Sequence, residues 1–300
     1  MPELRATTIQ GQETVLAEKA VEEFKTRLRG KLIRRCDEGY NEARTVFNAM
    51  IDRYPALIVR CAGVADVIDS VNFARDNNLL VAVRGGGHNV TGSAVCDGGV
   101  VIDLSQMKGM RVDPIARTVQ TEPGLTWGEL NHDLQVFELG ASGGFVSITG
   151  IPGLTLGGGF GWVVRKHGLA MDNLLSVDIV TADGRFLTAS SSQNSDLFWG
   201  VRGGGENFGA HRDLTYNFLV TSEWADRADS ERNIRWTRQF WEAVQPFLAK
   251  AVYVNYTSDE GDDVIKAAYA ANVRERLVAL KNKYDPTNLF RLNQNIKPTV

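Results

Sequence analysis

Residues 79–92 read LLVAVRGGGHNVTG, an apolar run that leads into three consecutive glycines. The apolar part, Leu79–Val83, predicts a buried strand that opens into a glycine loop. Upstream, Ala56–Arg60 predicts a strand and Val64–Asn77 an amphipathic helix, so the three segments together predict a strand–helix–strand unit. Consecutive glycines let backbone N–H groups converge on one concave spot, which suits a diphosphate. A tight turn is the alternative for a single triple glycine, and a packed or solvated side chain is the alternative for His88.

A second glycine-rich segment covers residues 142–161 and reads SGGFVSITGIPGLTLGGGFG. Ten glycines lie from Gly140 to Gly168, and each loses more backbone entropy on folding than alanine does. This cost indicates that the backbone here approaches another group closely. Residues 157–161 contain a G-x-G pattern, but the acidic residue that a Rossmann unit places after its second strand is missing. No glycine-rich run ends in Gly-Lys-Ser/Thr, which excludes a Walker A loop.

Composition narrows the class of protein. The 300 residues carry a formal net charge of −3, which gives no electrostatic footprint for nucleic acid or an anionic membrane surface. No apolar run reaches the length of about 18 residues typical of a membrane span, and the polar start of the chain differs from a secretory signal. The three cysteines fit neither a disulfide framework nor a zinc site, and the four histidines lack metal-binding spacing. We therefore expect a cytoplasmic protein without a metal and without nucleic-acid or membrane partners.

Helical and strand patterns alternate along the rest of the chain. Helices are predicted over residues 13–30 and over Thr126–Phe137, where Thr126 and Glu129 match a capping box. Two hairpins are predicted, with the strands Met110–Val112 and Thr118–Thr121 in the first and Leu175–Thr181 and Phe186–Thr188 in the second. Downstream, the patterns predict strands over Leu214–Val220 and Ala251–Tyr256 and helices over Ser230–Ala249 and Asp263–Tyr284. The whole pattern is typical of an α+β protein.

Four stretches carry a resemblance to a known family. They are RGGGHNVTG at 84–92, GIPGLTLGGGFGWVVRKHGLAMDNLLSVDIVTADG at 150–184, DLFWGVRGGGENFG at 196–209 and YDPTNLFRLNQNIKP at 284–298. In this order they closely resemble the berberine bridge enzyme-like flavoproteins, which are FAD-linked oxidoreductases with a PCMH-type FAD-binding domain. The resemblance implies an α+β, two-subdomain PCMH-type FAD-binding fold with a truncated substrate domain of antiparallel sheet and helices.

The resemblance also divides the chain into parts. The expected parts are an N-terminal helical segment (1–34), the PCMH-type FAD-binding domain (35–209), a remnant of the substrate domain with strands and helices (210–284), and a C-terminal tail that returns to the FAD domain (285–300). A large block of the family's substrate sheet is missing between Gly209 and Ala210. A naturally shortened member, a gene-model artefact and an engineered deletion are the alternatives for its origin.

The resemblance implies FAD as the cofactor. In such proteins the RGGGH loop holds the FAD diphosphate and its histidine bonds to the 8α-methyl of the flavin, so a covalent link is assigned to His88. Val146 stands where other members carry a cysteine that forms a second link, so no cysteinyl link is expected. The implied cofactor-binding residues are Arg84, Gly85, Gly86, Gly87, His88, Asn89, Gly92, Thr149, Gly150, Gly153, Leu154, Gly157, Gly158, Gly159, Gly161, His167, Gly168, Leu169, Asp172, Asn173, Val180, Asn293 and Asn295.

Residues 251–256, AVYVNY, resemble the Y-x-N-Y strand of the family's substrate domain, whose side chains face the flavin. The implied catalytic base is Tyr256, with Tyr253 as the second candidate. Residues i and i+3 of a strand point to opposite faces, so at least one of the two is expected to pack against the protein. The implied activity is hydride transfer from an alcohol, amine or sugar-like small-molecule substrate to FAD, with O2 as the electron acceptor.

Two alternatives remain for the function. A flavin-binding protein with little or no catalysis would result if the incomplete substrate domain leaves the flavin face open to water. A nucleotide-binding interaction module without flavin would use the same glycine loops and would be colourless. The sequence assigns neither the substrate nor the oligomeric state.

Overall fold

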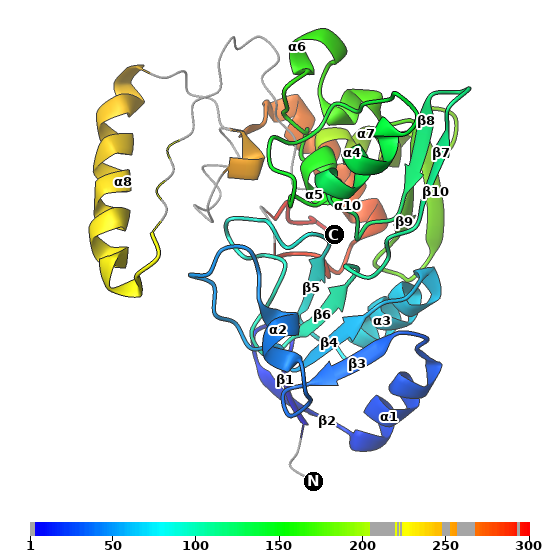
Figure 1. The fold of residues 1–300 in the computed structure, drawn as a ribbon. Coiled ribbons are helices and arrows are strands. Elements are labelled where there is room, and N and C mark those ends of the chain that lie inside the picture. The colour runs from blue at the N-terminus through cyan, green and yellow to red at the C-terminus, as the bar shows by residue number, and fades with distance from the viewer. Residues whose placement is uncertain are drawn as a thin grey trace.

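The computed structural model describes residues 4–204, 220, 222, 224–247, 253–256, 268–292 and 295–300. Its central sheet has four strands in the order β3–β4–β6–β5 (Figure 1). They are β3 (Lys31–Arg34), β4 (Leu57–Arg60), β5 (Val81–Arg84) and β6 (Val100–Asp103). β4 and β5 both pair with β6 in parallel, whereas β3 runs antiparallel to β4. The helix α3 (Val64–Asp76) connects β4 to β5, which confirms the predicted strand–helix–strand unit.

The central sheet is buried on both faces. Neighbouring side chains of a strand point to opposite faces, so Leu57 and Val59 enter one hydrophobic core while Ile58 enters another. The first core is completed by α1 (Glu18–Arg27) and α3, and the second by α2 (Tyr40–Arg44) with the chain that follows the glycine loop. The sheet therefore holds the start of the glycine loop, at the end of β5, in a rigid position.

The N-terminal segment differs from the helix predicted over residues 13–30. Its first residues form β2 (Glu13–Leu16), which pairs with β1 (Leu4–Thr7), and the helix α1 begins only at Glu18. Thr14 and Val15 are β-branched and favour the extended conformation once a partner strand is present. Residues 1–34 are therefore not simply a helical segment, because β3 at its end is an edge strand of the central sheet.

Both predicted hairpins are confirmed. β7 (Met110–Asp113) pairs with β8 (Thr118–Thr121), and β9 (Ser176–Val180) pairs with β10 (Phe186–Ser190). The predicted capping box is also present at Thr126, directly before α4 (Trp127–Gln135). The remaining short helices of this half are α5 (Ile151–Leu156), α6 (Val164–His167), η1 (Ala170–Asn173) and α7 (Ser195–Gly204). None of the helices in the described ranges is long and apolar enough to cross a membrane.

The C-terminal part contains fewer described elements. They are η2 (Arg227–Asp229), α8 (Ser230–Val244), η3 (Gln245–Phe247), η4 (Val254–Tyr256) and α10 (Ala271–Tyr284), and α8 lies at the side of the molecule, apart from the central sheet (Figure 1). The strand predicted over Ala251–Tyr256 is wrong at its end, because residues 254–256 form the 3₁₀ turn η4. Residues 251–252 and most of the strand predicted over Leu214–Val220 lie outside the described residues.

The C-terminal tail is tied to α10 by a buried carboxylate. Asp285 accepts hydrogen bonds from the Lys281 ammonium group at 2.5 Å and from the backbone N–H of Leu289 at 2.7 Å. The Leu289 side chain, 1% exposed, lies in the core beside the central sheet. Arg291 then donates to the carbonyl of Ile9, so the tail reaches the N-terminal hairpin.

A second buried carboxylate joins α1, β4 and α3. Asp66 is 2% exposed and accepts hydrogen bonds from the backbone N–H groups of Arg29, Gly30 and Ala62 at 2.7–2.9 Å. No other side chain in the described structure accepts a hydrogen bond from these three N–H groups. The carboxylate therefore substitutes for the backbone partners that these chain ends lack.

We predict that Asp66→Ala lowers the free energy of unfolding by about 3 kcal/mol, because it leaves three amide groups without their acceptor. Urea denaturation of the full chain measures this loss. The control is Asp69→Ala on the same helix, whose carboxylate meets Arg27 at 3.8 Å at the surface. It should cost less than about 1 kcal/mol. Equal losses in the two variants would contradict the role given to Asp66.

Candidate cofactor-binding site

The loop after β5 presents unused backbone donors. In the described part of the chain, the N–H groups of Gly85, Gly86 and Gly87 donate to no other backbone carbonyl. Gly87 has a φ of +64°, a backbone conformation that residues with a side chain rarely adopt. Its carbonyl accepts a hydrogen bond from the N–H of Phe47 at 3.0 Å. Unpaired amide groups in one turn form the kind of concave donor set that binds an anion such as a diphosphate.

His88 follows these amides and is oriented by an aromatic ring. Its imidazole stacks on Phe47 with 3.9 Å between the ring centroids and 14° between the planes. Its Nε2 atom is buried, and none of the described residues gives it a hydrogen-bond partner. Burial lowers the pKa of His88 below its ordinary value, so the ring is neutral at pH 7 and one ring nitrogen keeps its lone pair.

Asn89 and Gly92 serve the loop itself. The Asn89 side-chain oxygen accepts from the N–H of Thr91 at 2.9 Å and from the hydroxyl of Ser93 at 2.9 Å. A Cβ on Gly92 would meet the Ile51 side chain at 2.6 Å. In these contacts Asn89 stabilises the loop that carries His88, and Gly92 leaves room for the Ile51 side chain.

The two glycine-rich segments touch through their backbones. A Cβ on Gly86 would lie 2.5 Å from the backbone nitrogen of Gly150, and a Cβ on Gly150 would lie 2.6 Å from that of Gly86. Gly150 also forms a bridge with Thr126, and the N–H of Trp127 donates to Thr149. The predicted residues Gly86, Thr149 and Gly150 therefore lie together, where the strand end, α4 and α5 meet.

Tyr253 lies against the second glycine segment. Its phenolic oxygen accepts from the N–H of Gly159 at 3.0 Å and of Phe160 at 3.2 Å. Asn255 donates to the same oxygen at 2.8 Å and lies so close to Gly157 that any side chain there would collide with it. Burial raises the pKa of Tyr253, while the three accepted hydrogen bonds act in the opposite direction.

Tyr253 and Tyr256 lie on the same side of the chain. Their ring centroids are 4.9 Å apart in an edge-to-face arrangement. The expectation that they face opposite ways is wrong, because it assumed a strand, whereas residues i and i+3 of a 3₁₀ turn eclipse each other. Both predicted catalytic candidates are therefore close to the second glycine segment.

The residues predicted after this segment mainly support it. The N–H groups of Ala170 and Met171 donate to the carbonyls of Gly159 and Gly158, respectively. Asp172 accepts from the N–H of Leu169, and Asn173 donates to the carbonyls of His167 and Leu169. Gly168 takes a φ of +77° at the turn. The side chains of Asp172 and Asn173 thus stabilise the 167–173 turn, and its backbone N–H groups hold it against the glycines.

The other predicted residues divide into three groups. Gly153 and Leu154 belong to α5, where the Leu154 carbonyl accepts from Asn255, and Gly161 packs on the backbone of Gly143. The side chains of His167 and Val146 are exposed, and that of Val180 packs beside the central core. The Asn295 side-chain oxygen is buried without a partner among the described residues, and Asn293 lies outside them.

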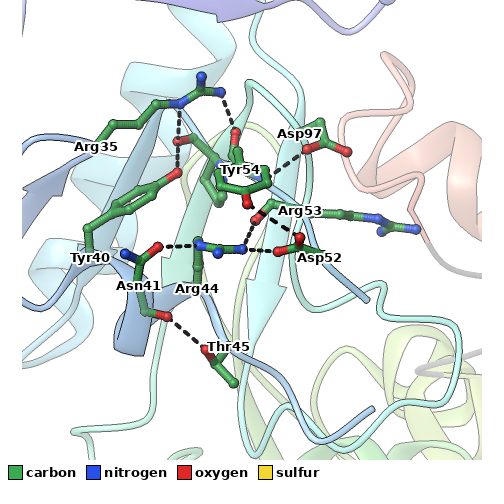
Figure 2. Close-up of polar contacts among 10 residues, drawn as sticks. Arg35, Tyr40, Asn41, Arg44, Thr45, Asp52, Arg53, Tyr54 and Asp97 are labelled. Carbon is green, nitrogen blue, oxygen red and sulfur yellow. Dashed lines mark hydrogen bonds and ion pairs between the residues drawn. The ribbon is translucent and has the colours of Figure 1, made fainter. Parts of the chain in front are cut away.

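A polar framework behind the His88 loop was not predicted from the sequence. Figure 2 shows Arg44 between Asn41 and Asp52, with an ion pair to Asp52 at 2.5 Å and its guanidinium 4.0 Å above the Tyr54 ring. Arg44 holds the pKa of Asp52 below its usual value. Arg53, labelled in the same view, donates to the carbonyls of Gly92 and Val95 at 3.0 and 2.8 Å. The only signal for this framework was the cluster of charged and aromatic residues before β4.

The residues of the site fit FAD on two observations. Among the described residues, the Gly85–Gly87 amides donate to no backbone carbonyl and can bind a diphosphate, and the buried Nε2 of His88 has no hydrogen-bond partner. Within the same described ranges, no group of three or more His, Cys, Asp or Glu side chains could hold a metal ion. The arrangement therefore suits an organic diphosphate cofactor with a ring near His88.

We predict that Gly86→Ala lowers the free energy of unfolding by about 2 kcal/mol and reduces bound flavin, because its methyl group would push Gly150 away. Thermal unfolding and the ratio of flavin to protein absorbance measure the two effects. Gly140→Ala is the matched control, since a Cβ there meets nothing within 4 Å. A Gly86→Ala protein as stable and as yellow as the control would rule out the close contact.

Two family models match the chain. The model described as "FAD binding domain" matches residues 55–190, and the model described as "Berberine and berberine like" matches residues 252–297. A curated relative, (R)-6-hydroxynicotine oxidase of Paenarthrobacter nicotinovorans, is 38% identical over 182 residues, which are 61% of this chain and 40% of the relative. The chain spans less than half the length of the first curated relatives that it matches.

Solved structures share the fold. The crystal structure of 6-hydroxy-D-nicotine oxidase from Arthrobacter nicotinovorans has a TM-score of 0.81 and 21% identity, over 90% of this chain and 98% of that chain. Xylooligosaccharide oxidase from Myceliophthora thermophila C1 has a TM-score of 0.58 and 31% identity, over 63% of this chain and 41% of that chain. With the glycine loops and the cofactor fit, the two family-model matches show that the chain carries the FAD-binding domain and the berberine-like segment of the berberine bridge enzyme-like FAD-linked oxidoreductases, in a PCMH-type FAD-binding fold.

Proposed function

We propose that the protein is an FAD-dependent oxidoreductase that oxidises an alcohol, amine or sugar-like small molecule, with FAD held covalently by His88 and O2 as the electron acceptor. The observation that carries this proposal is the buried Nε2 of His88, which lacks a partner in the described structure and follows three glycine N–H groups that donate to no described backbone carbonyl. The named relatives support the substrate class, since one is an oxidase of 6-hydroxynicotine and another of xylooligosaccharide.

Each part of the site has a separate task in this proposal. The Gly85–Gly87 amides bind the diphosphate. Gly150 lets the second glycine segment lie against Gly86, and Gly157–Gly159 leave room for Asn255, Tyr253 and Ala170. When bound, FAD supplies the acceptor for a hydride from the substrate carbon.

The tyrosine pair supplies the proton acceptor in this proposal. Oxidation of a hydroxyl or amine needs a group that takes the proton from the heteroatom as the adjacent C–H bond breaks. Three hydrogen bonds converge on the Tyr253 oxygen, and such donors stabilise a phenolate. They offset part of the effect of burial, which leaves the pKa of Tyr253 raised. Tyr256 contacts the Tyr253 ring edge-on and is the first candidate for contact with the substrate.

A flavin-binding protein with little or no catalysis is the second candidate function. The observation that favours it is the length of the chain, which spans less than half of its first curated relatives. A site that is open to water stabilises the charges of a reaction less well than a dry one.

The two candidates are separated by anaerobic addition of alcohols, amines and mono- and oligosaccharides to the purified yellow protein. For the oxidoreductase we expect the flavin absorbance near the blue end of the visible spectrum to bleach with at least one class of substrate, and to return when O2 is admitted. In Tyr253→Phe and Tyr256→Phe the rate of bleaching should fall about 100-fold for the residue that accepts the proton. An unbleached spectrum with every substrate supports the flavin-binding protein, and a colourless protein contradicts both.

We predict that His88→Ala binds FAD only dissociably. Acid precipitation should leave the flavin with the wild-type pellet but release it into the supernatant from the variant, because the variant lacks the bonding nitrogen. The control is His132→Ala, which changes an exposed ring on α4 that contacts Asp133. If His88→Ala still retains flavin after denaturation, the covalent link lies elsewhere.

A further inference from the structure

Phe47 contacts the His88 loop in two ways. Its ring lies nearly parallel to the imidazole, with 3.9 Å between centroids and 14° between planes. Its backbone N–H donates to the carbonyl of Gly87, the residue directly before His88, at 3.0 Å. One residue thus fixes both the backbone that leads into His88 and the plane of its side chain.

The residues after Phe47 continue this support along the loop. Asn48 donates from its side-chain amide to the carbonyl of Val90 at 2.8 Å. Arg53 donates to the carbonyls of Gly92 and Val95. Arg44 in turn holds the segment from behind, through Asp52 and the Arg53 carbonyl at 3.2 Å (Figure 2). The segment 47–53 is therefore anchored independently of the His88 ring, so the position of the Phe47 backbone does not depend on the stack.

The exposure of Phe47 indicates that its ring does not serve to pack the hydrophobic core. The side chain is 52% exposed, and neither core of the central sheet includes it. A parallel stack restricts rotation of the imidazole about its bond to Cβ and shields one face of it from water. A bond-forming nitrogen must be both deprotonated and correctly aimed, and misplacement by about 1 Å can cost about 100-fold in rate.

We propose that Phe47 is a positioning residue that sets the plane of the His88 ring for covalent attachment of FAD. The inference rests on the covalent link of the proposed function. In that attachment a C–N bond replaces one C–H bond of the flavin 8α-methyl and the N–H bond of the imidazole. The two hydrogens and two electrons are taken up by the flavin ring, and O2, the acceptor named above, then removes them as hydrogen peroxide.

The test follows attachment in full-length chains purified from riboflavin-limited cells and then given FAD in air. In Phe47→Ala the rate at which flavin becomes acid-precipitable should fall at least about tenfold, while total bound FAD and the melting temperature stay close to wild type. Phe47→Tyr keeps a flat ring and should attach FAD at nearly the wild-type rate. Phe137→Ala, at an exposed phenylalanine after α4, is the matched control.

Each outcome decides the inference. A slow Phe47→Ala with a fast Phe47→Tyr supports it. A Phe47→Ala as fast as wild type overturns it, and so does a variant that loses attachment, total FAD and thermal stability together, because that result shows a role in folding alone. If wild-type protein binds FAD but never attaches it, the covalent part of the proposed function fails and the inference falls with it. If only the substrate tests fail, the inference stands.

Discussion

The site depends on the backbone contact between Gly86 and Gly150. It joins the loop after β5 of the central sheet to the start of the helix α5, at a distance that excludes even a methyl group. The sheet fixes the first partner, since β5 is paired with β6 up to Arg84. The second is fixed by the bridge from Gly150 to Thr126, before the capped helix α4. Two rigid elements therefore meet beside the Gly85–Gly87 N–H groups, which donate to no backbone carbonyl within the described ranges.

Local sequence signals were enough for most of this arrangement. The glycine runs, the strands on either side of α3, both hairpins and the capping box at Thr126 depend on residues close together in the chain, so their pattern is readable without a fold. The family resemblance added which of these loops meet. His88 was singled out on that basis, and the structure gives it a buried nitrogen without a partner among the described residues.

The features that were missed depend on contacts between distant residues. The conformation of η4 is accompanied by hydrogen bonds from Gly159 and Phe160 to Tyr253, which a strand-like sequence such as AVYVNY does not reveal. The strand β2 needs its partner β1, and without it the same residues fit a helical pattern. The stack of Phe47 on His88 joins two segments on either side of β4 and α3, and no spacing rule predicts it.

The Tyr253 contact is one of those that hold C-terminal residues to the rest of the chain. Two of the donors to its oxygen are backbone N–H groups of the glycine segment. The Tyr253 ring lies where a side chain at Gly158 would otherwise stand, so the contact depends on glycine at that position. The C-terminal tail is anchored separately, through Asp285 and the buried Leu289. Tyr253 and the C-terminal tail thus both contact the part of the chain that lies before residue 205. Separate sets of contacts therefore hold these C-terminal residues against the rest of the chain: Tyr253 binds the second glycine segment, and the tail binds the central core and the N-terminal hairpin.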